Sequence, residues 1–276
     1  TKAIECIRFT MPIDDAKLSY VFENLPWGII KKNRTGIGAT TLELNSPRHS
    51  IIVVPTRALA YEKAKSSRIG NTNKYKVLYI GGKIDRFNIP TIKDYLADEE
   101  IRYKKFIVVV DSLYKLLEEV GESNYKDYFF MIDEIDSYQN DSWYRPNMEK
   151  AIDYYFKFPF RNRCMVSATV GDFSNPMIKE EPVIEVAFNN PIPRNITLQP
   201  TDNVLIGTVN KIVELSEQHP NEKILVALNL VTRGILPVIL SLPEELQEEC
   251  SVLCGEKSRI HVEGYYKELL SSQLPS

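Results

Sequence analysis

The stretch from Lys31 to Thr41 brings two glycines and a pair of adjacent threonines together between an apolar run and an expected helix. The apolar run is Trp27 to Ile30, and the helix begins near Thr40. In this order of strand, glycine turn and helix start, free backbone N–H groups and a helix N-terminus face one anion. The sequence therefore predicts a loop that binds phosphate groups.

The predicted loop lacks the lysine that completes the usual phosphate-binding signature. That signature ends Gly-Lys-Ser/Thr, and Ala39 occupies the lysine position here. A cation at the entry of the loop, Lys31, Lys32 or Arg34, is able to supply the missing charge by folding over the phosphates. The residues that we expect to bind nucleotide are Lys32, Gly36, Ile37, Gly38, Ala39, Thr40 and Thr41.

An apolar run from Tyr128 to Ile132 ends in two adjacent carboxylates, Asp133 and Glu134. Strand ends of open α/β sheets border the crevice where these sheets bind ligands. Asp133 is suited to hold Mg²⁺ there through the water shell of the ion. Glu134 is suited to orient and deprotonate an attacking water. The alternative is a solvated strand end whose acids cap the following helix.

Other expected strand ends carry polar groups or glycines. Ser167 and Thr169 follow an apolar run, and short hydroxyl side chains there can hydrogen-bond the acidic pair and report its state. Thr56 and Arg57 would present donors to a phosphate. The glycine pair at 81–82 allows close approach of the backbone to a nucleic-acid strand. An ordinary turn is the alternative for each of these segments.

The expected elements alternate between strand and helix over some 170 residues of the chain, which favours a parallel α/β sheet with right-handed crossovers. Several of the strands are continuous apolar runs, as strands covered on both faces should be. Strands are expected at 27–30, 50–54, 76–80, 106–110, 129–133 and 163–167, and helices at 56–68, 90–100, 112–120 and 148–156.

Four prolines between 182 and 200 interrupt this alternation and predict a linker. We expect one domain at 1–188 and the opening part of a second α/β domain at 189–276, for which a small appendage docked on the first domain is the alternative. The second part should contain a helix at 203–218, a strand at 223–228 and an amphipathic stretch at 230–242.

The 276 residues carry a net charge of −3, and this charge is unevenly distributed. Residues 1–110 hold 19 Lys and Arg against 11 Asp and Glu, and residues 111–276 hold 15 against 26. The basic first part suggests a polyanionic partner, and lysines scattered over solvated helix faces are the alternative. Aromatic side chains with interspersed bases at 151–161 could stack nucleobases, although such a cluster at helical spacing also suits a core.

The bulk composition is that of an ordinary soluble protein, with 43% hydrophobic and 26% charged residues. It contains no apolar run of about 18 residues, so we expect no membrane span. The four cysteines are sparse and no histidine pair completes a zinc site. We therefore expect reduced cysteines and a cytoplasmic location. Glu43, Glu62 and the acidic run 244–249 are interpreted as solvated.

Six short motifs occur in an order that resembles the first domain of superfamily-two (DEAD-like) helicases. They are Thr-Gly-Ile-Gly-Ala-Thr, Pro-Thr-Arg-Ala-Leu-Ala, Gly-Gly, Val-Val-Val-Asp-Ser-Leu, Asp-Glu-Ile-Asp and Ser-Ala-Thr, spanning about Asn33 to Thr169. The resemblance implies a nucleic-acid-dependent ATPase built on RecA-like parallel sheets with helices on both faces. The segment 222–229 resembles the first strand of a second RecA-like domain.

The resemblance also implies roles for individual residues. Gly36, Gly38 and Thr40 would contact phosphates and Mg²⁺, with Asp133 as the second magnesium residue. Glu134 would activate water, and Ser167 and Thr169 would couple hydrolysis to nucleic acid. The implied nucleic-acid track consists of Thr56, Arg57, Gly81, Gly82, Asp111 and Ser112.

The chain departs from this family at three points. Ala39 replaces the loop lysine, no glutamine precedes Gln139 to read adenine, and no segment that would supply an arginine finger is present. An arginine finger alone is worth about 10³–10⁵ in rate. Further domains of a longer parent chain could donate the arginine.

The expected function is therefore a helicase-like ATPase that uses ATP and Mg²⁺ and acts on DNA or RNA, most simply as single strands. Because Ala39 replaces the loop lysine, the alternative hypothesis is a nucleic-acid-binding module that keeps this fold but does not hydrolyse ATP. A third reading is an unrelated P-loop-like phosphotransferase, which the Pro-Thr-Arg and Ser-Ala-Thr motifs disfavour.

Overall fold

The structure is a computed structural model, and it describes residues 6–12, 16–57, 60, 64, 77–81, 90–140, 147–169, 173, 175–189 and 196–266. Its contacts divide the chain into two compact units, Thr1–Pro193 and Arg194–Ser276. Within the described residues, none of the helices is both long and apolar enough to cross a membrane.

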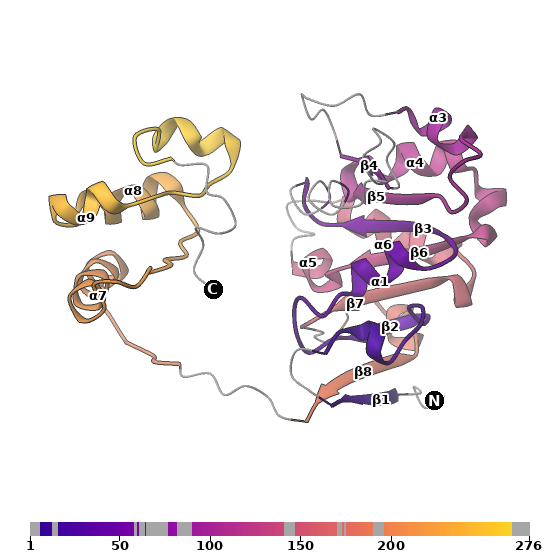
Figure 1. Ribbon diagram of the computed structural model, residues 1–276, viewed down its shortest axis with the longest axis horizontal. Coiled ribbons are helices and arrows are strands. Elements are labelled where there is room, and N and C mark those ends of the chain that lie inside the picture. Colours follow the sequence, from indigo (N-terminus) through magenta and orange to yellow (C-terminus); the bar gives the residue numbers. More distant parts are fainter. Residues whose placement is uncertain are drawn as a thin grey trace. The chain divides into compact units, whose positions relative to one another are not determined.

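The first unit is built on one sheet whose strands all run parallel (Figure 1), so the expected α/β fold is confirmed. The spatial order of its eight described strands is β1-β8-β2-β7-β6-β3-β5-β4. The strands are β1 (Cys6–Met11), β2 (Gly28–Lys31), β3 (His49–Val54), β4 (Leu78–Ile80), β5 (Lys105–Val109), β6 (Tyr128–Asp133), β7 (Arg163–Ser167) and β8 (Val183–Phe188).

Helices cover both faces of this sheet. One apolar cluster joins one face of the sheet to α3 (Ile92–Ala97), α4 (Leu113–Val120), α5 (Ile135–Asn140) and α6 (Asn147–Lys157). A second cluster joins the other face to α1 (Ala39–Asn45). Successive side chains of β3 divide between the two clusters, because neighbouring residues of a strand point to opposite faces. The central strands are therefore apolar at consecutive positions.

Two strands, β1 and β8, were not predicted from the sequence. β1 lies at the edge of the sheet and most of its residues are exposed to solvent, so its sequence lacks the apolar run of a covered strand. β8 follows Pro182, and its end at Phe188 falls in the segment that the prolines suggested was a linker. Of the helix expected at 56–68, residues 57, 60 and 64 are helical, and the others after Thr56, Glu62 among them, lie outside the described residues.

The second unit contains the helices α7 (Val204–Gln218), α8 (Leu236–Leu240) and α9 (Glu244–Glu249). The Asn203 side chain caps α7 by accepting a hydrogen bond from the Ile206 N–H, at 3.2 Å. The strand expected at 223–228 is not formed, and Leu225 is exposed. A strand needs hydrogen-bonded neighbours, and the described residues of this unit contain a single β-bridge, Val252 to Tyr266.

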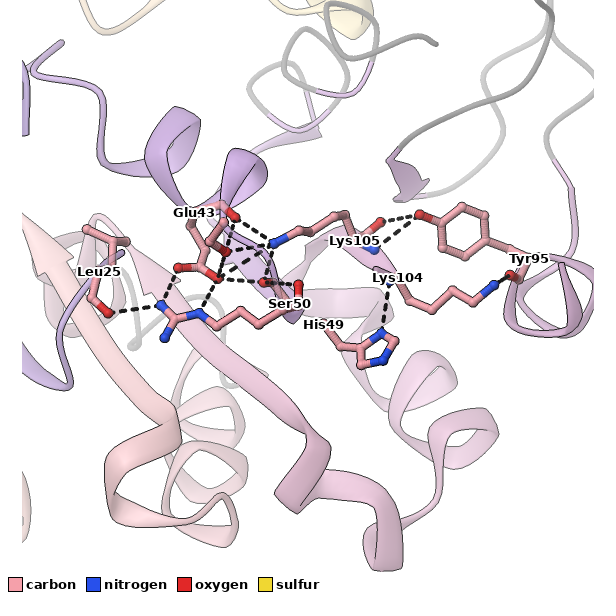
Figure 2. A network of polar contacts seen from close by, with 9 residues as sticks. Leu25, Glu43, His49, Ser50, Tyr95, Lys104 and Lys105 are labelled. Atoms are coloured by element: carbon pink, nitrogen blue, oxygen red, sulfur yellow. Dashed lines mark hydrogen bonds and ion pairs between the residues drawn. The ribbon is translucent and has the colours of Figure 1, made fainter. Parts of the chain in front are cut away.

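Glu43 of α1 is fully buried, so its interpretation as a solvated residue is wrong. Figure 2 shows its carboxylate within a network of polar side chains. Arg48 approaches it from two nitrogens, at 3.0 and 2.5 Å, and the Ser50 hydroxyl donates to it at 2.5 Å. The Lys105 ammonium lies 3.9 Å from the same carboxylate.

Lys105 joins this network from β5. Its ammonium donates to the Glu43 carbonyl at 2.7 Å and to the hydroxyls of Ser46 and Ser50, each at 2.8 Å. The network therefore ties the C-terminal end of α1 to the N-terminal ends of β3 and β5. Since α1 directly follows the predicted phosphate loop, these contacts also position that loop.

We expect Glu43→Ala to lower the free energy of unfolding by about 3–5 kcal/mol, because the substitution leaves the buried Lys105 ammonium and the partly buried Arg48 guanidinium without their counter-charge. The measurement is urea unfolding followed by circular dichroism. Glu119→Ala is the control, because it removes an exposed ion pair with Lys93 and should cost about 1 kcal/mol or less. Equal losses in the two variants would contradict the role given to the buried network.

Candidate nucleotide site

Three neighbouring strands bring the predicted nucleotide residues to one edge of the sheet. β2 pairs with β7 so that Lys31 lies opposite Ser167, and β6 pairs with β7 so that Asp133 lies opposite Val166. The backbone N–H of Lys32 continues the ladder by donating to the Ser167 carbonyl, at 2.7 Å. Because parallel strands end at the same edge, Lys32, Ser167 and Asp133 fall in one row.

Lys32 is the cation of this row, and it is almost fully buried. Its ammonium lies 3.0 Å from Glu134 Oε1 and 3.6 Å from Asp133 Oδ1. The other two cations at the loop entry face elsewhere. Lys31 lies 3.5 Å from a carboxylate oxygen of Glu185, and the Arg34 guanidinium stacks 4.3 Å from the centre of the Phe188 ring. Among the contacts that the structure describes for these three residues, those of Lys32 reach the acidic pair.

Thr40 and Asp133 form a second contact between the loop and the acids. The Thr40 hydroxyl donates to Asp133 Oδ2 at 2.6 Å, and both side chains are buried. Asp133 Oδ1 is buried and has no hydrogen-bond partner among the described residues. No three His, Cys, Asp or Glu side chains gather as metal ligands in the part of the chain that the structure describes. Mg²⁺ needs only one or two carboxylates beside water and phosphate oxygens, so Asp133 and Thr40 fit this ion.

Ser167 and Thr169 converge on a third acid, Asp136. The Ser167 hydroxyl donates to Asp136 Oδ1 at 2.5 Å and lies 3.3 Å from Glu134 Oε2, and the Thr169 hydroxyl donates to Asp136 Oδ2 at 2.7 Å. Asp136 was not among the predicted site residues. A sequence signal could have identified it. Asp136 lies three residues after Asp133, in the first turn of the helix that follows β6.

The backbone at Glu134 has a φ of 55°, in the left-handed region that residues other than glycine seldom adopt. This conformation separates β6 from α5, which begins at the next residue. Non-glycine residues in this region concentrate at functional sites, where surrounding contacts hold them. Here the contacts of Glu134 with Lys32 and Ser167 hold the side chain.

The backbone of the predicted phosphate loop lies in the left-handed region at both of its glycines. Gly36 and Gly38 have φ values of 71° and 87°, and Gly38 is the N-cap of α1. The Lys17 ammonium donates to the Gly36 carbonyl and the Leu18 N–H donates to the Ile37 carbonyl, both at 2.9 Å. These two bonds hold the loop from outside.

The side chains that follow Gly38 divide between core and solvent. The Ala39 side chain is buried in the second apolar cluster, and it has no charge with which to bind a phosphate. Thr41 is exposed.

The predicted nucleic-acid residues follow β3, β5 and β4 at the same edge, on the other half of the sheet. Thr56 and Arg57 are exposed after β3, and Asp111 and Ser112 follow β5 in a 3₁₀ turn, Val110–Ser112. The sequence placed Gly82 on this track as well, and it lies outside the described residues.

Gly81 is buried after β4, and its small size is already required by packing. A Cβ at this position would lie 2.2 Å from the Tyr79 hydroxyl. Burial raises the pKa of Tyr79, and the nearby charge of Arg57 acts in the opposite direction. Because packing against Tyr79 already accounts for a glycine at position 81, a role of Gly81 in nucleic-acid binding stays a prediction.

No protein-family model matches this chain, and no curated protein sequence matches it. Among solved structures, it is similar to Mss116p with a double deletion of the NTE and C-tail, bound to ssRNA and AMP-PNP, at 13% identity and a TM-score of 0.44, over 74% of this chain and 47% of that chain. It is also similar to the DEAD-box helicase Mss116 bound to ssRNA and UDP-BeF, at 12% identity and a TM-score of 0.45, over 78% of this chain and 55% of that chain. The chain thus spans about half the length of these proteins.

Lys32 and Glu134 should stabilise the ligand-free fold together, because each is the nearest opposite charge of the other. In a double-mutant cycle of Lys32→Met and Glu134→Gln, we expect a coupling free energy of about 0.5–3 kcal/mol in urea unfolding without nucleotide. The matched cycle of Lys31→Met and Glu185→Gln concerns a more exposed pair and should give about 1 kcal/mol or less. Additive losses for Lys32 and Glu134 would show that this ion pair does not form in solution.

Proposed function

We propose that the chain is a helicase-like, nucleic-acid-dependent ATPase in which Lys32 replaces the lysine missing from the phosphate loop. The observation that carries this proposal is the position of the Lys32 ammonium, 3.0 Å from Glu134 and 3.6 Å from Asp133. A buried ammonium is expensive unless opposite charges surround it. Lys32, the residue that follows β2, therefore places a positive charge beside the two acids that nucleotide hydrolysis requires.

The nucleotide would bind with its phosphates along the loop from Gly36 to Thr41. Asp133 and the Thr40 hydroxyl would hold Mg²⁺, which supplies charge neutralisation of the phosphates when bound. Lys32, with three N–H donors on a flexible stem, would transfer its ammonium from the carboxylates to the phosphate oxygens.

Glu134 would then be free to act as the general base. Its carboxylate would orient a water molecule and accept a proton from it as the water attacks the terminal phosphate. The transfer of Lys32 explains why one lysine can serve two purposes. It neutralises the acids of the ligand-free site, and it neutralises the phosphates of the occupied site.

Hydrolysis would be coupled to nucleic acid through Asp136, Ser167 and Thr169. Ser167 contacts both Glu134 and Asp136, so a change at the catalytic acid alters the hydrogen bonds of the turn that follows β7. Thr56 and Arg57, which follow β3 at the other side of β6, would contact the nucleic-acid backbone. Both DNA and RNA suit such contacts. Further domains of a longer chain would supply the arginine finger.

A second candidate function is nucleic-acid binding without turnover, which the buried Ala39 side chain favours. In that case the acids, Thr40 and Lys32 form only a structural network that fixes the loop. The two functions differ in one testable respect. In the ATPase, nucleotide binding depends on Lys32, whereas a purely structural network does not require nucleotide binding.

Lys32→Ala should weaken binding of ATP with Mg²⁺ by about 10- to 150-fold, since one charged hydrogen bond is worth about 1.5–3 kcal/mol. Titration calorimetry at 25 °C provides the measurement. Lys31→Ala is the matched control, because it removes the adjacent lysine, whose partner is Glu185. Equal affinities in the wild type and the Lys32 variant, with both folded by circular dichroism, would exclude the substitute-lysine role.

Glu134→Gln should keep ATP affinity within about threefold and lower the rate of hydrolysis by about 10²–10⁴, the usual contribution of a general base. Phosphate release should be followed with and without oligo(U) and oligo(dT), in the longest form of the protein that folds. Hydrolysis absent in the wild type under every condition would favour the binding module.

A further inference from the structure

A small cavity of about 270 Å³ lies between α4 and α6, beside the end of β5. Its floor is apolar and consists of Val110, Leu113 and Ala151, all of which are buried. Its wall also includes Asp111, which the sequence placed on the nucleic-acid track. The cavity therefore lies at the edge of the sheet that carries the candidate nucleotide site, on the half away from β2.

Two tyrosines and a lysine complete the lining of this cavity. Tyr114, on α4, has 47% of its surface exposed, and Tyr154 of α6 is half-buried. Lys150 of α6 is exposed beside them. Each tyrosine ring also has an ammonium near it, since Lys115 lies 5.7 Å from the centre of the Tyr114 ring and Lys157 lies 5.7 Å from that of Tyr154.

We propose that this cavity binds one unstacked base of a single-stranded nucleic acid. The proposal rests on the proposed function, because it assumes that a nucleic acid crosses this edge of the sheet. It adds a base-binding site to a track whose predicted residues contact only the backbone. Tyr114 and Tyr154 would supply aromatic surface for the base, and Lys115 and Lys150 would bind the flanking phosphates.

The size and chemistry of the cavity both favour a single base. Its volume is slightly below the ~300–1,000 Å³ of sites that enclose drug-sized ligands, so one ring system fits better than a complete nucleoside triphosphate. Aromatic side chains stack on any base, because every base has a π-face. Ammonium groups beside the rings suit an aromatic ligand that is attached to phosphates. A hydrophobic peptide side chain would gain nothing from these cations.

The experiment measures the affinity of the full chain for fluorescently labelled 12-mers by anisotropy at fixed salt. The probes are oligo(U), oligo(dT) and an abasic 12-mer with the same number of phosphates. The variants are Tyr114→Ala and Tyr114→Phe. Tyr20→Ala is the control, because Tyr20 is also an exposed tyrosine, with 69% of its surface accessible, and does not line the cavity.

Tyr114→Ala should weaken binding of oligo(U) or oligo(dT) by about 5- to 100-fold, the usual effect of removing one stacking ring. Tyr114→Phe should keep the wild-type affinity, Tyr20→Ala should leave it unchanged, and the abasic probe should bind equally to all variants. The probe whose affinity falls more in Tyr114→Ala, oligo(U) or oligo(dT), shows whether the base comes from RNA or DNA.

A second measurement uses the wild type, so it does not depend on the folding of a variant. Irradiation of the complex with a 12-mer that contains 4-thiouridine should attach the base to Tyr114 or Tyr154, as located by mass spectrometry. Wild-type binding with neither the Tyr114→Ala loss nor this crosslink would overturn the base pocket and leave the proposed function standing. Absence of wild-type binding to any probe would overturn both.

Discussion

The ion pair of Lys32 with Glu134 and Asp133 depends on the order of three strands, and the candidate site depends on that pair. β7 separates β2 from β6, so the loop and the acidic pair face each other across the end of one intervening strand. That strand contributes Ser167, whose carbonyl fixes the backbone of Lys32 and whose hydroxyl contacts Glu134. The geometry is thus set by backbone hydrogen bonds, which are less easily displaced than contacts between surface side chains.

The remainder of the first unit holds these strand ends in place. Apolar side chains on both faces of the central strands bury the sheet between α1 and the helices α3 to α6. The buried network around Glu43 fixes the end of α1 away from the loop, and Lys17 and Leu18 fix the loop itself. The loop is therefore anchored at both sides, while the acids opposite it are held by Lys32, Thr40 and Ser167.

The central part of the sheet could be predicted from sequence because strands covered on both faces leave a continuous apolar run. The edge strand β1 leaves no such signal, since most of its side chains face solvent. Glu43 was misjudged for a different reason. Besides Arg48, its network includes Lys105, 62 residues away in sequence, and no local pattern reveals that contact. The choice between Lys31 and Lys32 likewise needed the structure, because strand pairing determines which adjacent residue faces Glu185 and which faces the acids.

The central claim is that Lys32 exchanges its carboxylate partners for phosphate oxygens when nucleotide binds. A crystal structure of the chain with Mg²⁺ and a non-hydrolysable ATP analogue tests this claim most directly. The account predicts the Lys32 ammonium within hydrogen-bond distance of a phosphate oxygen and no longer 3.0 Å from Glu134, its distance in the present structure. A bound nucleotide whose phosphates contact Lys31, Arg34 or no cation, with Lys32 still paired to Glu134, would contradict it.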